Sequence, residues 1–201
     1  MHRDLLRLVA ITDNLRDGVD GLTRRAVASH RGGATMIQLR LPDESARTLT
    51  AAARALIAAV DLPVVVHARV DVALAAGAAG VHLGVDDIAV SDVRRLCGEK
   101  FVIGRSAATE EDLRRAEGAD YVALGPAFAV DRRSGSALGM SEFERLVRSA
   151  GLPVVAVGGI SPATAPEAIR AGACGVALIS GIFGSPDPET AAREVRSAIE
   201  T

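Results

Sequence analysis

The residues best suited to chemistry in this chain lie at the ends of short apolar segments. Gln38 and Arg40 end the segment Met36–Leu41, and His82 ends another, shortly before Asp87. Alternate residues of an extended strand share a face, so Gln38 and Arg40 are expected to point the same way. A buried guanidinium needs an anionic partner. We expect either an arm that reaches a substrate phosphate or an internal ion pair with an acid such as Asp87.

Two turns near the carboxyl end of the chain suit phosphate binding. Gly158 and Gly159 follow one apolar segment, and Ile179 and Ser180 end the next. Backbone N–H groups in such turns bind phosphate oxygens, and glycine lets the backbone approach them closely. The alternative is that the glycine pair is only a tight turn. We expect a phosphate cradle formed by both segments.

Other polar residues follow the remaining apolar segments. Ser106 offers a hydroxyl to a phosphate, and His67 lies near the same predicted ends. Arg133 lies in the longest polar stretch, which we expect to be a lid that carries cations. The alternatives are an exposed arginine without function for Arg133 and a hydrogen-bonded core histidine for His82. Asp87 is either a Mg²⁺ ligand beside a diphosphate or part of a solvated turn.

These residues need a scaffold that brings distant strand ends together. Gly-Ala pairs at positions 33, 77, 118 and 172 each end a helix-like stretch and precede an apolar segment. With the segments between them, they predict eight strands that alternate with eight helices, which favours parallel strands. We therefore expect a single domain over residues 1–201, a compact (β/α)8 TIM barrel with short loops and its site at the carboxyl ends of the strands. An open doubly wound sheet is the alternative.

The segments themselves can be placed from apolar runs and helix signals. The expected strands are Arg7–Thr12, Met36–Leu41, Leu62–Val66, Gly80–Gly84, Phe101–Ser106, Asp120–Phe128, Leu152–Val155 and Gly175–Ser180. The expected helices are Gly21–Arg31, Ser45–Val60, Val70–Ala76, Val90–Leu96, Thr109–Glu117, Met140–Ala150, Ala163–Ala171 and Pro188–Ile199.

Composition limits the classes of partner. The 201 residues carry 23 basic and 25 acidic side chains, a net charge of −2 that offers no field for nucleic acid. No apolar run approaches the roughly 18 residues of a membrane span. Two isolated cysteines, Cys97 and Cys174, and an amino-terminal stretch unlike a signal peptide favour a reduced, cytoplasmic protein. We expect small phosphate-bearing molecules as partners, with neither nucleic acid nor membrane. A homodimer is left open.

Taken together, the motifs resemble the thiamine phosphate synthase and TenI-like thiazole tautomerase family over nearly the whole chain. The matching stretches are Gly33–Arg40, Arg69–Leu74, Gly80–Gly84, Gly118–Val122, Gly125-Pro126, Pro153–Ile160 and Ser180–Phe183. The resemblance implies an enzyme of thiamine biosynthesis, a transferase. An aminopyrimidine diphosphate loses diphosphate with the help of Mg²⁺, and the nitrogen of a thiazole phosphate captures the cation to give thiamine phosphate.

The resemblance also implies roles for the candidate residues. Gln38 and His82 would line a pyrimidine pocket, and Arg40 and Ser106 would contact the diphosphate. The expected catalytic residues are Arg40, Ser106 and Arg133, and the expected metal ligand is Asp87. The expected substrate-binding residues are Gln38, His67, His82, Gly84, Gly158, Gly159, Ile179 and Ser180.

The chain departs from the family pattern at charged positions. Pro42 stands where the synthases have Lys, and His67 and Ala68 stand where they have Asn-Asp, whose acid is a metal ligand. Arg133 replaces the Lys of the lid, though not as an equivalent point charge. A lost carboxylate and a lost cation would weaken the departure of diphosphate, where charge stabilisation matters most.

Two alternatives to the synthase remain from these departures. A TenI-like tautomerase is favoured by Gly104-Arg105-Ser106, although Ala108 stands where that branch has its catalytic His. A non-catalytic binder of thiazole phosphate or thiamine phosphate would explain Ala68 and Pro42. An aldose–ketose or epimerase step would need paired acids, or an acid with Lys, at strand ends, and we find no such pair in the sequence.

Overall fold

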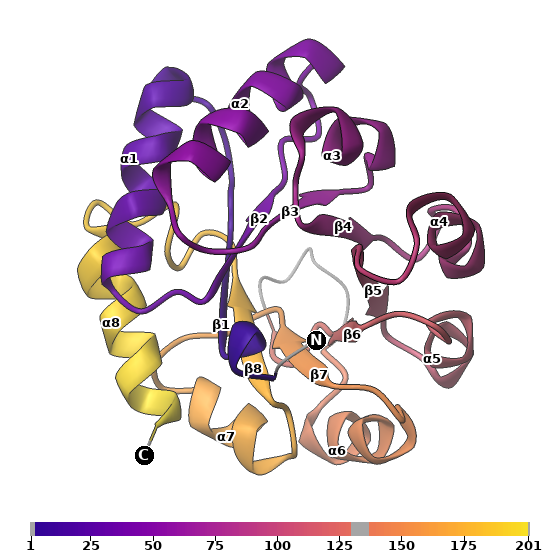
Figure 1. Cartoon of the computed structure of the whole chain (residues 1–201). Coiled ribbons are helices and arrows are strands. Elements are labelled where there is room, and N and C mark those ends of the chain that lie inside the picture. Colours follow the sequence, from indigo (N-terminus) through magenta and orange to yellow (C-terminus); the bar gives the residue numbers. More distant parts are fainter. Residues whose placement is uncertain (1–2, 130–136, 201) are drawn as a thin grey trace.

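The chain folds into a closed ring of eight parallel strands surrounded by helices (Figure 1). This computed structural model describes residues 3–129 and 137–200. Strands pair in chain order, and β8 pairs back to β1 with Leu8 opposite Val176. The expected (β/α)8 barrel is therefore confirmed, and the open sheet is excluded.

The bounds of the elements agree closely with the expected segments. The strands are Leu8–Ile11 (β1), Met36–Leu39 (β2), Val64–His67 (β3), Gly80–Leu83 (β4), Val102–Ala107 (β5), Tyr121–Leu124 (β6), Val154–Val157 (β7) and Gly175–Leu178 (β8). The helices are Gly18–Arg31 (α1), Ala46–Ala59 (α2), Val70–Ala76 (α3), Val90–Cys97 (α4), Glu110–Arg115 (α5), Met140–Ser149 (α6), Ala165–Arg170 (α7) and Pro188–Ile199 (α8).

Local signals explain where several helices begin and end. Ser45 accepts a hydrogen bond from the Thr48 N–H at the start of α2, and Thr109 and Asp112 form a reciprocal capping box at the start of α5. These side chains satisfy backbone donors that the first helical turn leaves unpaired. Gly77 ends α3 with a left-handed φ of 73°, which glycine adopts without a steric penalty.

The structure differs from the expected segments at both ends of the barrel. A 3₁₀ helix, Arg3–Leu6, precedes β1 and was not expected. It buries Leu6 among the side chains that fill the barrel interior. Strand β6 ends at Leu124 and does not continue to Phe128, because Pro126 has no N–H to donate to the neighbouring strand.

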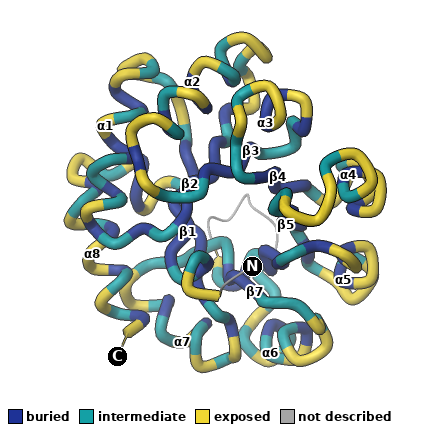
Figure 2. Tube along the Cα trace, in the orientation of Figure 1, coloured by how far each residue is buried: buried dark blue, intermediate teal, exposed yellow. Residues whose placement is uncertain are grey.

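Apolar side chains lie on both faces of the sheet, as in other parallel barrels, and the strands are buried over most of their length (Figure 2). The interior cluster comprises Leu6, Val9, Ile11, Met36, Val65, Tyr121, Val155 and Ala177. Two further clusters, one of them much larger, fill the space between the strands and the helices. Room for Tyr121 inside the ring depends on Gly104, because a Cβ at that position would lie 2.2 Å from the Tyr121 Cζ.

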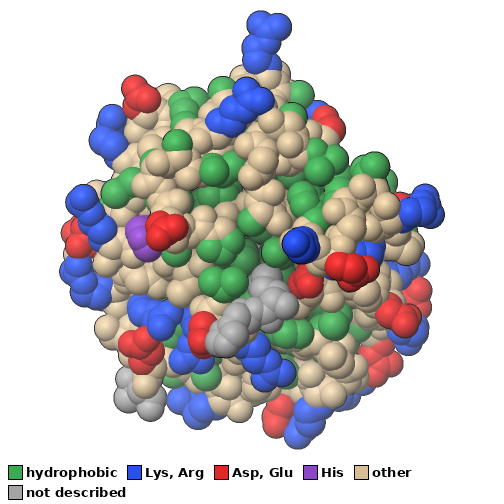
Figure 3. Space-filling model, viewed as in Figure 1, with side chains coloured by type: hydrophobic (Ala, Val, Ile, Leu, Met, Phe, Trp, Pro, Cys, Tyr) green, Lys and Arg blue, Asp and Glu red, His purple; other side chains and the backbone are tan. Residues whose placement is uncertain are grey.

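The surface carries mixed charge. On the face shown in Figure 3, basic and acidic side chains are interspersed around the rim and form no single basic patch. Within the described residues, no helix is both long enough and apolar enough to cross a membrane.

A half-buried ion pair ties α4 to the start of β6. Arg94 Nη2 lies 2.9 Å from Asp120 Oδ2, and the same oxygen accepts a 2.8 Å hydrogen bond from the Ile103 N–H. Arg94 also donates to the carbonyl oxygens of Gly98 and Phe101. A single carboxylate therefore joins two strands and a helix at the amino-terminal rim.

We predict that Asp120→Ala destabilises the protein by about 1–3 kcal/mol, because it leaves the Arg94 guanidinium and a buried N–H without their acceptor. Urea unfolding at neutral pH measures this loss. Glu144→Ala is the matched control, since it removes an exposed i,i+4 pair with Arg148 worth roughly 0.5 kcal/mol or less. Equal losses in the two variants would contradict the structural role of Asp120.

Candidate active site

A pocket opens at the centre of the barrel and encloses about 120 Å³. Its polar lining comes from the ends of four strands and from Tyr121 at the start of β6. The lining residues are Val9, Ile11, Gln38, Arg40, His67, His82, Ser106, Tyr121, Ala123, Val155, Val157, Ala177 and Ile179. The pocket thus brings together six of the predicted site residues, which lie far apart in the sequence: Gln38, Arg40, His67, His82, Ser106 and Ile179.

A buried hydrogen-bonded chain forms the wall of this pocket. The His82 ring contacts the Tyr121 hydroxyl through Nδ1 and the Ser106 hydroxyl through Nε2, both at 3.0 Å. Tyr121 also hydrogen-bonds the Gln38 side chain. We use the name polar chain for Gln38, Tyr121, His82 and Ser106. Tyr121 was missed in the sequence because it begins its strand, although it is the only tyrosine present.

Burial keeps the polar chain neutral. Loss of solvent lowers the pKa of His82 to about 3, and the neighbouring His67 and Arg105 act in the same direction. Burial raises the pKa of Tyr121 well above its ordinary value. Each imidazole nitrogen and each hydroxyl can then donate or accept according to the tautomer of His82. The wall suits a ligand that presents both donors and acceptors.

His67 lies beside this chain at the end of β3. Its ring stacks on the His82 ring, with centroids 5.9 Å apart and planes at 19°. Burial and the charge of Arg40 lower the pKa of His67, while Asp87 opposes them. Its Nδ1 atom is buried without a hydrogen-bond partner among the described residues. His67 is thus a neutral, flat surface next to two charged groups.

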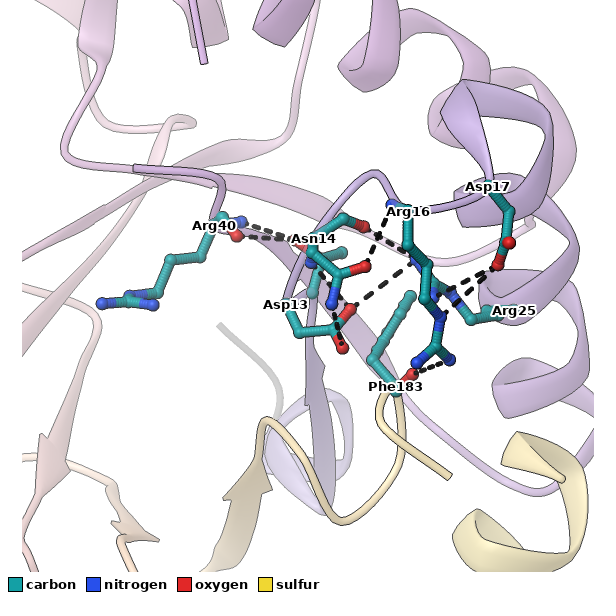
Figure 4. Close-up of polar contacts among 8 residues, drawn as sticks. Asp13, Asn14, Arg16, Asp17, Arg25, Arg40 and Phe183 are labelled. Atoms are coloured by element: carbon teal, nitrogen blue, oxygen red, sulfur yellow. Dashed lines mark hydrogen bonds and ion pairs between the residues drawn. The ribbon is translucent and has the colours of Figure 1, made fainter. Parts of the chain in front are cut away.

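Arg40 extends into the pocket as a cation without a protein anion. Its backbone N–H and carbonyl oxygen both bond the hydroxyl of Thr12, which fixes the end of β2 against the end of β1. In Figure 4 its side chain points away from the neighbouring polar cluster. No ion pair joins Arg40 to any described residue, so the alternative of an internal pair with Asp87 is not formed.

That neighbouring cluster holds the β1–α1 loop. Arg25, with 9% of its side chain exposed, lies 3.6 Å from Asp13 and donates a 2.7 Å hydrogen bond to the Asn14 carbonyl. Its guanidinium also lies over the Phe183 ring, and Arg16 donates to the Phe183 carbonyl (Figure 4). These contacts join the loop after β1 to the segment after β8, beside the predicted phosphate cradle.

The turns of the predicted phosphate cradle leave their amides unused within the described part of the chain. The turns after β7 and β8 line a pocket of about 340 Å³ that includes Gly158, Gly159, Ile179 and Ser180. The N–H groups of residues 158–160 and 179–181 donate no hydrogen bond to any described residue. Backbone donors rarely stay unpaired unless water or a ligand accepts from them. The two turns thus leave several backbone donors available beside one pocket.

The reason for the two glycines differs from the expected one. A Cβ on Gly158 would lie 2.6 Å from Pro126, and a Cβ on Gly159 would lie 2.7 Å from Phe128. Both residues also have left-handed φ values, 89° and 65°. The segment after β6 packs against this turn, so the glycines are required by contacts within the protein as well as by access for a ligand.

The central pocket and the cradle form one continuous depression. They share the lining residues Val157, Ala177 and Ile179. Ser106 and Gly158 also line a third hollow that adjoins both of them. The Arg40 guanidinium and the backbone donors of two turns therefore border a common space with apolar walls. Such a space can hold two anionic groups joined to organic rings.

Asp87 and Gly84 contact each other at the end of β4. The Gly84 N–H donates a 2.6 Å hydrogen bond to Asp87 Oδ2, so this amide is already used. The other carboxylate oxygen takes no hydrogen bond from the described residues. No cluster of three or more His, Cys, Asp or Glu side chains in the described part of the chain could hold a metal. Neither Asp87 nor the neighbouring Asp86 belongs to such a cluster within the described ranges.

Two further features of the sequence remain, at Arg133 and Ala68. Arg133 lies outside the described residues. Ala68, which follows His67, has a left-handed φ of 61° and donates its N–H to the His82 carbonyl at 2.8 Å. Among residues with a Cβ, Asn and Asp adopt this conformation most readily.

We predict that wild-type stability falls as the pH drops from about 6.5 to 5, by up to about 1 kcal/mol per unit. The folded pKa of His82 lies below its ordinary value of 6.5, so in this range the unfolded chain binds a proton that the folded chain does not. Urea unfolding at several pH values measures the slope. His82→Gln should flatten it; identical slopes in both proteins would refute the assignment.

Comparisons with known proteins agree with this geometry. A family model described as thiamine monophosphate synthase matches residues 8–182. The thiamine-phosphate synthase of Roseiflexus sp. (strain RS-1) is 43% identical over 196 residues, which cover 94% of this chain and 83% of that protein. The thiamine-phosphate synthase of Methanoculleus marisnigri is 41% identical over 185 residues, which cover 89% and 86%.

Solved structures give the same result. Thiamine phosphate pyrophosphorylase from Pyrococcus furiosus superposes with a TM-score of 0.86 at 35% identity and covers 98% of this chain and 97% of that one. A 3-hexulose-6-phosphate synthase, at 21% identity and a TM-score of 0.72, shares the fold. With the family model spanning most of the barrel, the chain belongs to the thiamine monophosphate synthase family.

Proposed function

We propose that this protein is a transferase that couples a thiazole phosphate to an aminopyrimidine diphosphate. The bond between the pyrimidine methylene carbon and the diphosphate oxygen breaks, and its electron pair leaves with the diphosphate. The lone pair of the thiazole nitrogen forms the new C–N bond. The products are thiamine phosphate and diphosphate, so atoms and charges balance. Relatives that carry the name thiamine-phosphate synthase support this assignment.

The observation that carries the proposal is the pair of anion sites on one depression. The amides of residues 158–160 and 179–181 suit the phosphate of the thiazole, because backbone donors and a turn favour a dianion. Arg40 suits the diphosphate of the second substrate, because its guanidinium lacks a protein anion among the described residues. A condensation of two phosphorylated molecules needs two such sites, whereas a tautomerase or a binder of one monoester needs one.

The polar chain suits the aminopyrimidine ring. A pyrimidine with an amino group presents a donor beside ring-nitrogen acceptors. Gln38 can meet both with its amide, and Tyr121 and His82 hold that amide in place through the hydrogen bonds described above. The adjacent His67 ring offers a flat surface for stacking. Apolar walls such as Val155 and Ile179 exclude water from the reacting carbon.

A Mg²⁺ ion fits this site only if the substrate supplies most of its ligands. Asp87 has one carboxylate oxygen without a protein partner, and Mg²⁺ commonly binds through one or two carboxylates plus substrate phosphates and water. When bound, the ion would neutralise charge on the departing diphosphate. Because Ala68 and Pro42 carry no charge, Arg40 and Asp87 supply the charged side chains of the described residues at this end of the site, and Arg133 is proposed to add a cation.

The same proposal extends to the cellular setting. The two cysteines of the chain, Cys97 and Cys174, are free thiols, which suits the reducing cytoplasm. Small phosphorylated molecules are its proposed partners, in keeping with the mixed surface charge of the face in Figure 3.

We expect the purified protein to form thiamine phosphate and release diphosphate when it is given Mg²⁺, the aminopyrimidine diphosphate and the thiazole phosphate. Chromatography of the product and a coupled diphosphate assay measure both. The thiazole alcohol, which lacks the phosphate, is the control and should react far more slowly because it leaves the cradle amides unpaired. Binding of thiazole phosphate without turnover at high protein concentration would favour a non-catalytic binder, and its isomerisation alone would favour a tautomerase.

We predict that Arg40→Ala lowers kcat/KM for the aminopyrimidine diphosphate by roughly 30-fold, which corresponds to about 2 kcal/mol for a charge-assisted hydrogen bond. The KM for thiazole phosphate should stay near the wild-type value, because Arg40 lines the central pocket and not the pocket formed by the cradle turns. Arg47→Ala, which removes an exposed arginine of α2, is the matched control. Steady-state kinetics with each substrate varied in turn measure both constants. An equal loss of kcat/KM for the two substrates would contradict the role of Arg40.

A further inference from the structure

We propose that Arg105 is a positioning residue that holds Asp87 in place for a metal–diphosphate complex. This inference rests on the proposed function, which brings a diphosphate to the carboxyl end of β4. Arg105 lies in β5 beside Ser106, but on the opposite face of the strand. Ser106 faces the barrel interior, so Arg105 faces the layer between the sheet and the helices.

The Arg105 side chain is buried, and all its hydrogen bonds to described residues go to one loop. Only 4% of the residue is exposed. Its guanidinium donates to the carbonyl oxygens of Val85 at 2.9 Å, Ile88 at 2.9 Å and Asp87 at 3.3 Å. All three acceptors belong to the turn that follows β4. The planar fork of arginine can satisfy several carbonyls at once, which an ammonium group does with less geometric control.

This arrangement is unlike that of Arg94, a half-buried arginine of the helix layer. Arg94 pairs with the carboxylate of Asp120 at the amino-terminal rim. Arg105 has no carboxylate within ion-pair distance among the described residues. A buried cation that is paired only with carbonyl groups costs more desolvation energy than an apolar side chain of the same size. A structural role alone is therefore a poor reason for a charge at this position.

The loop that Arg105 holds has few other anchors. Val85 and Ile88 are 39% and 54% exposed, so they contribute little burial to its stability. Within the loop, the Gly84 N–H bonds Asp87 Oδ2, and the Asp87 N–H bonds the Gly84 carbonyl at 3.2 Å. The three hydrogen bonds from Arg105 attach this hydrogen-bonded turn to β5. They fix where the second oxygen of Asp87 points.

The contacts of Asp87 indicate why its position matters. The charge of Asp87 acts on the ring of His67, and Arg40 acts on the same ring with the opposite sign. Both charges therefore act on one side chain of the pocket lining, beside which the diphosphate is proposed to bind. A ligand held by one carboxylate is sensitive to small displacements, because no second protein acid compensates for them.

The test measures Mn²⁺ binding by electron paramagnetic resonance in the presence of inorganic diphosphate. Arg105→Met should weaken Mn²⁺ binding by about 10-fold or more, the usual effect of losing an outer-shell partner of a metal ligand. Arg105→Lys should recover part of the loss. Arg94→Met is the control, because it removes a half-buried guanidinium at the opposite rim and should lower stability without changing Mn²⁺ affinity.

A double-mutant cycle shows whether Arg105 acts through Asp87. Asp87→Asn alone should weaken Mn²⁺ binding, and adding Arg105→Met to it should cause no further loss. In turnover assays, Arg105→Met should raise the Mg²⁺ concentration for half-maximal rate and leave the KM for thiazole phosphate unchanged. If Arg105→Met fails to fold, Arg105→Lys and the cycle built on it give the same readouts.

Three outcomes would overturn the inference. They are unchanged Mn²⁺ affinity in folded Arg105 variants, equal effects of Arg94→Met and Arg105→Met, and fully additive losses in the cycle. Failure of the proposed function gives a different result. Mn²⁺–diphosphate binding would still depend on Arg105, while the wild-type protein would form no thiamine phosphate.

Discussion

Buried polar groups in this barrel need hydrogen-bond partners, and the groups without a partner among the described residues mark its candidate binding site. Inside the sheet, Tyr121, His82 and Ser106 satisfy one another in an interior that is otherwise apolar. At the carboxyl mouth, the amides of the cradle and the guanidinium of Arg40 have no acceptor among the described residues. The fold supplies these donors because parallel strands end together there, and anions are the ligands that such donors accept.

Binding and bond breaking make different demands on these groups. The proposed binding of a phosphate monoester relies on backbone amides, which remain in place when side chains are substituted. Departure of diphosphate relies on charged side chains, and this is where the chain differs from the pattern of the synthases, at Pro42 and Ala68. The remaining charges, Arg40 and Asp87, are therefore the ones on whose placement the proposed reaction depends. The buried Arg105 belongs to the same arrangement, since it holds the loop that carries Asp87.

Period-two alternation and the position of strand ends were enough to predict the barrel and the shared direction of Gln38 and Arg40. They did not predict Tyr121, because it begins its strand and reaches the pocket only through the space left by Gly104. Arg105 was also missed, since alternation places it toward the helices, where apolar residues are expected. Both depend on contacts between segments that are distant in sequence, which a local pattern does not contain.

The backbone at Ala68 has a consequence for protein engineering. A left-handed conformation at a residue with a Cβ costs roughly 1–2 kcal/mol, and the chain retains it here with a side chain that gains nothing from it. An aspartate at position 68 would find a backbone conformation that it adopts readily. Its carboxylate would lie beside His67, at the same rim of the barrel as Asp87. The single substitution Ala68→Asp can therefore add a second carboxylate without remodelling the loop. The pair of proteins then allows the cation requirement of a site with one carboxylate to be compared with that of a site with two.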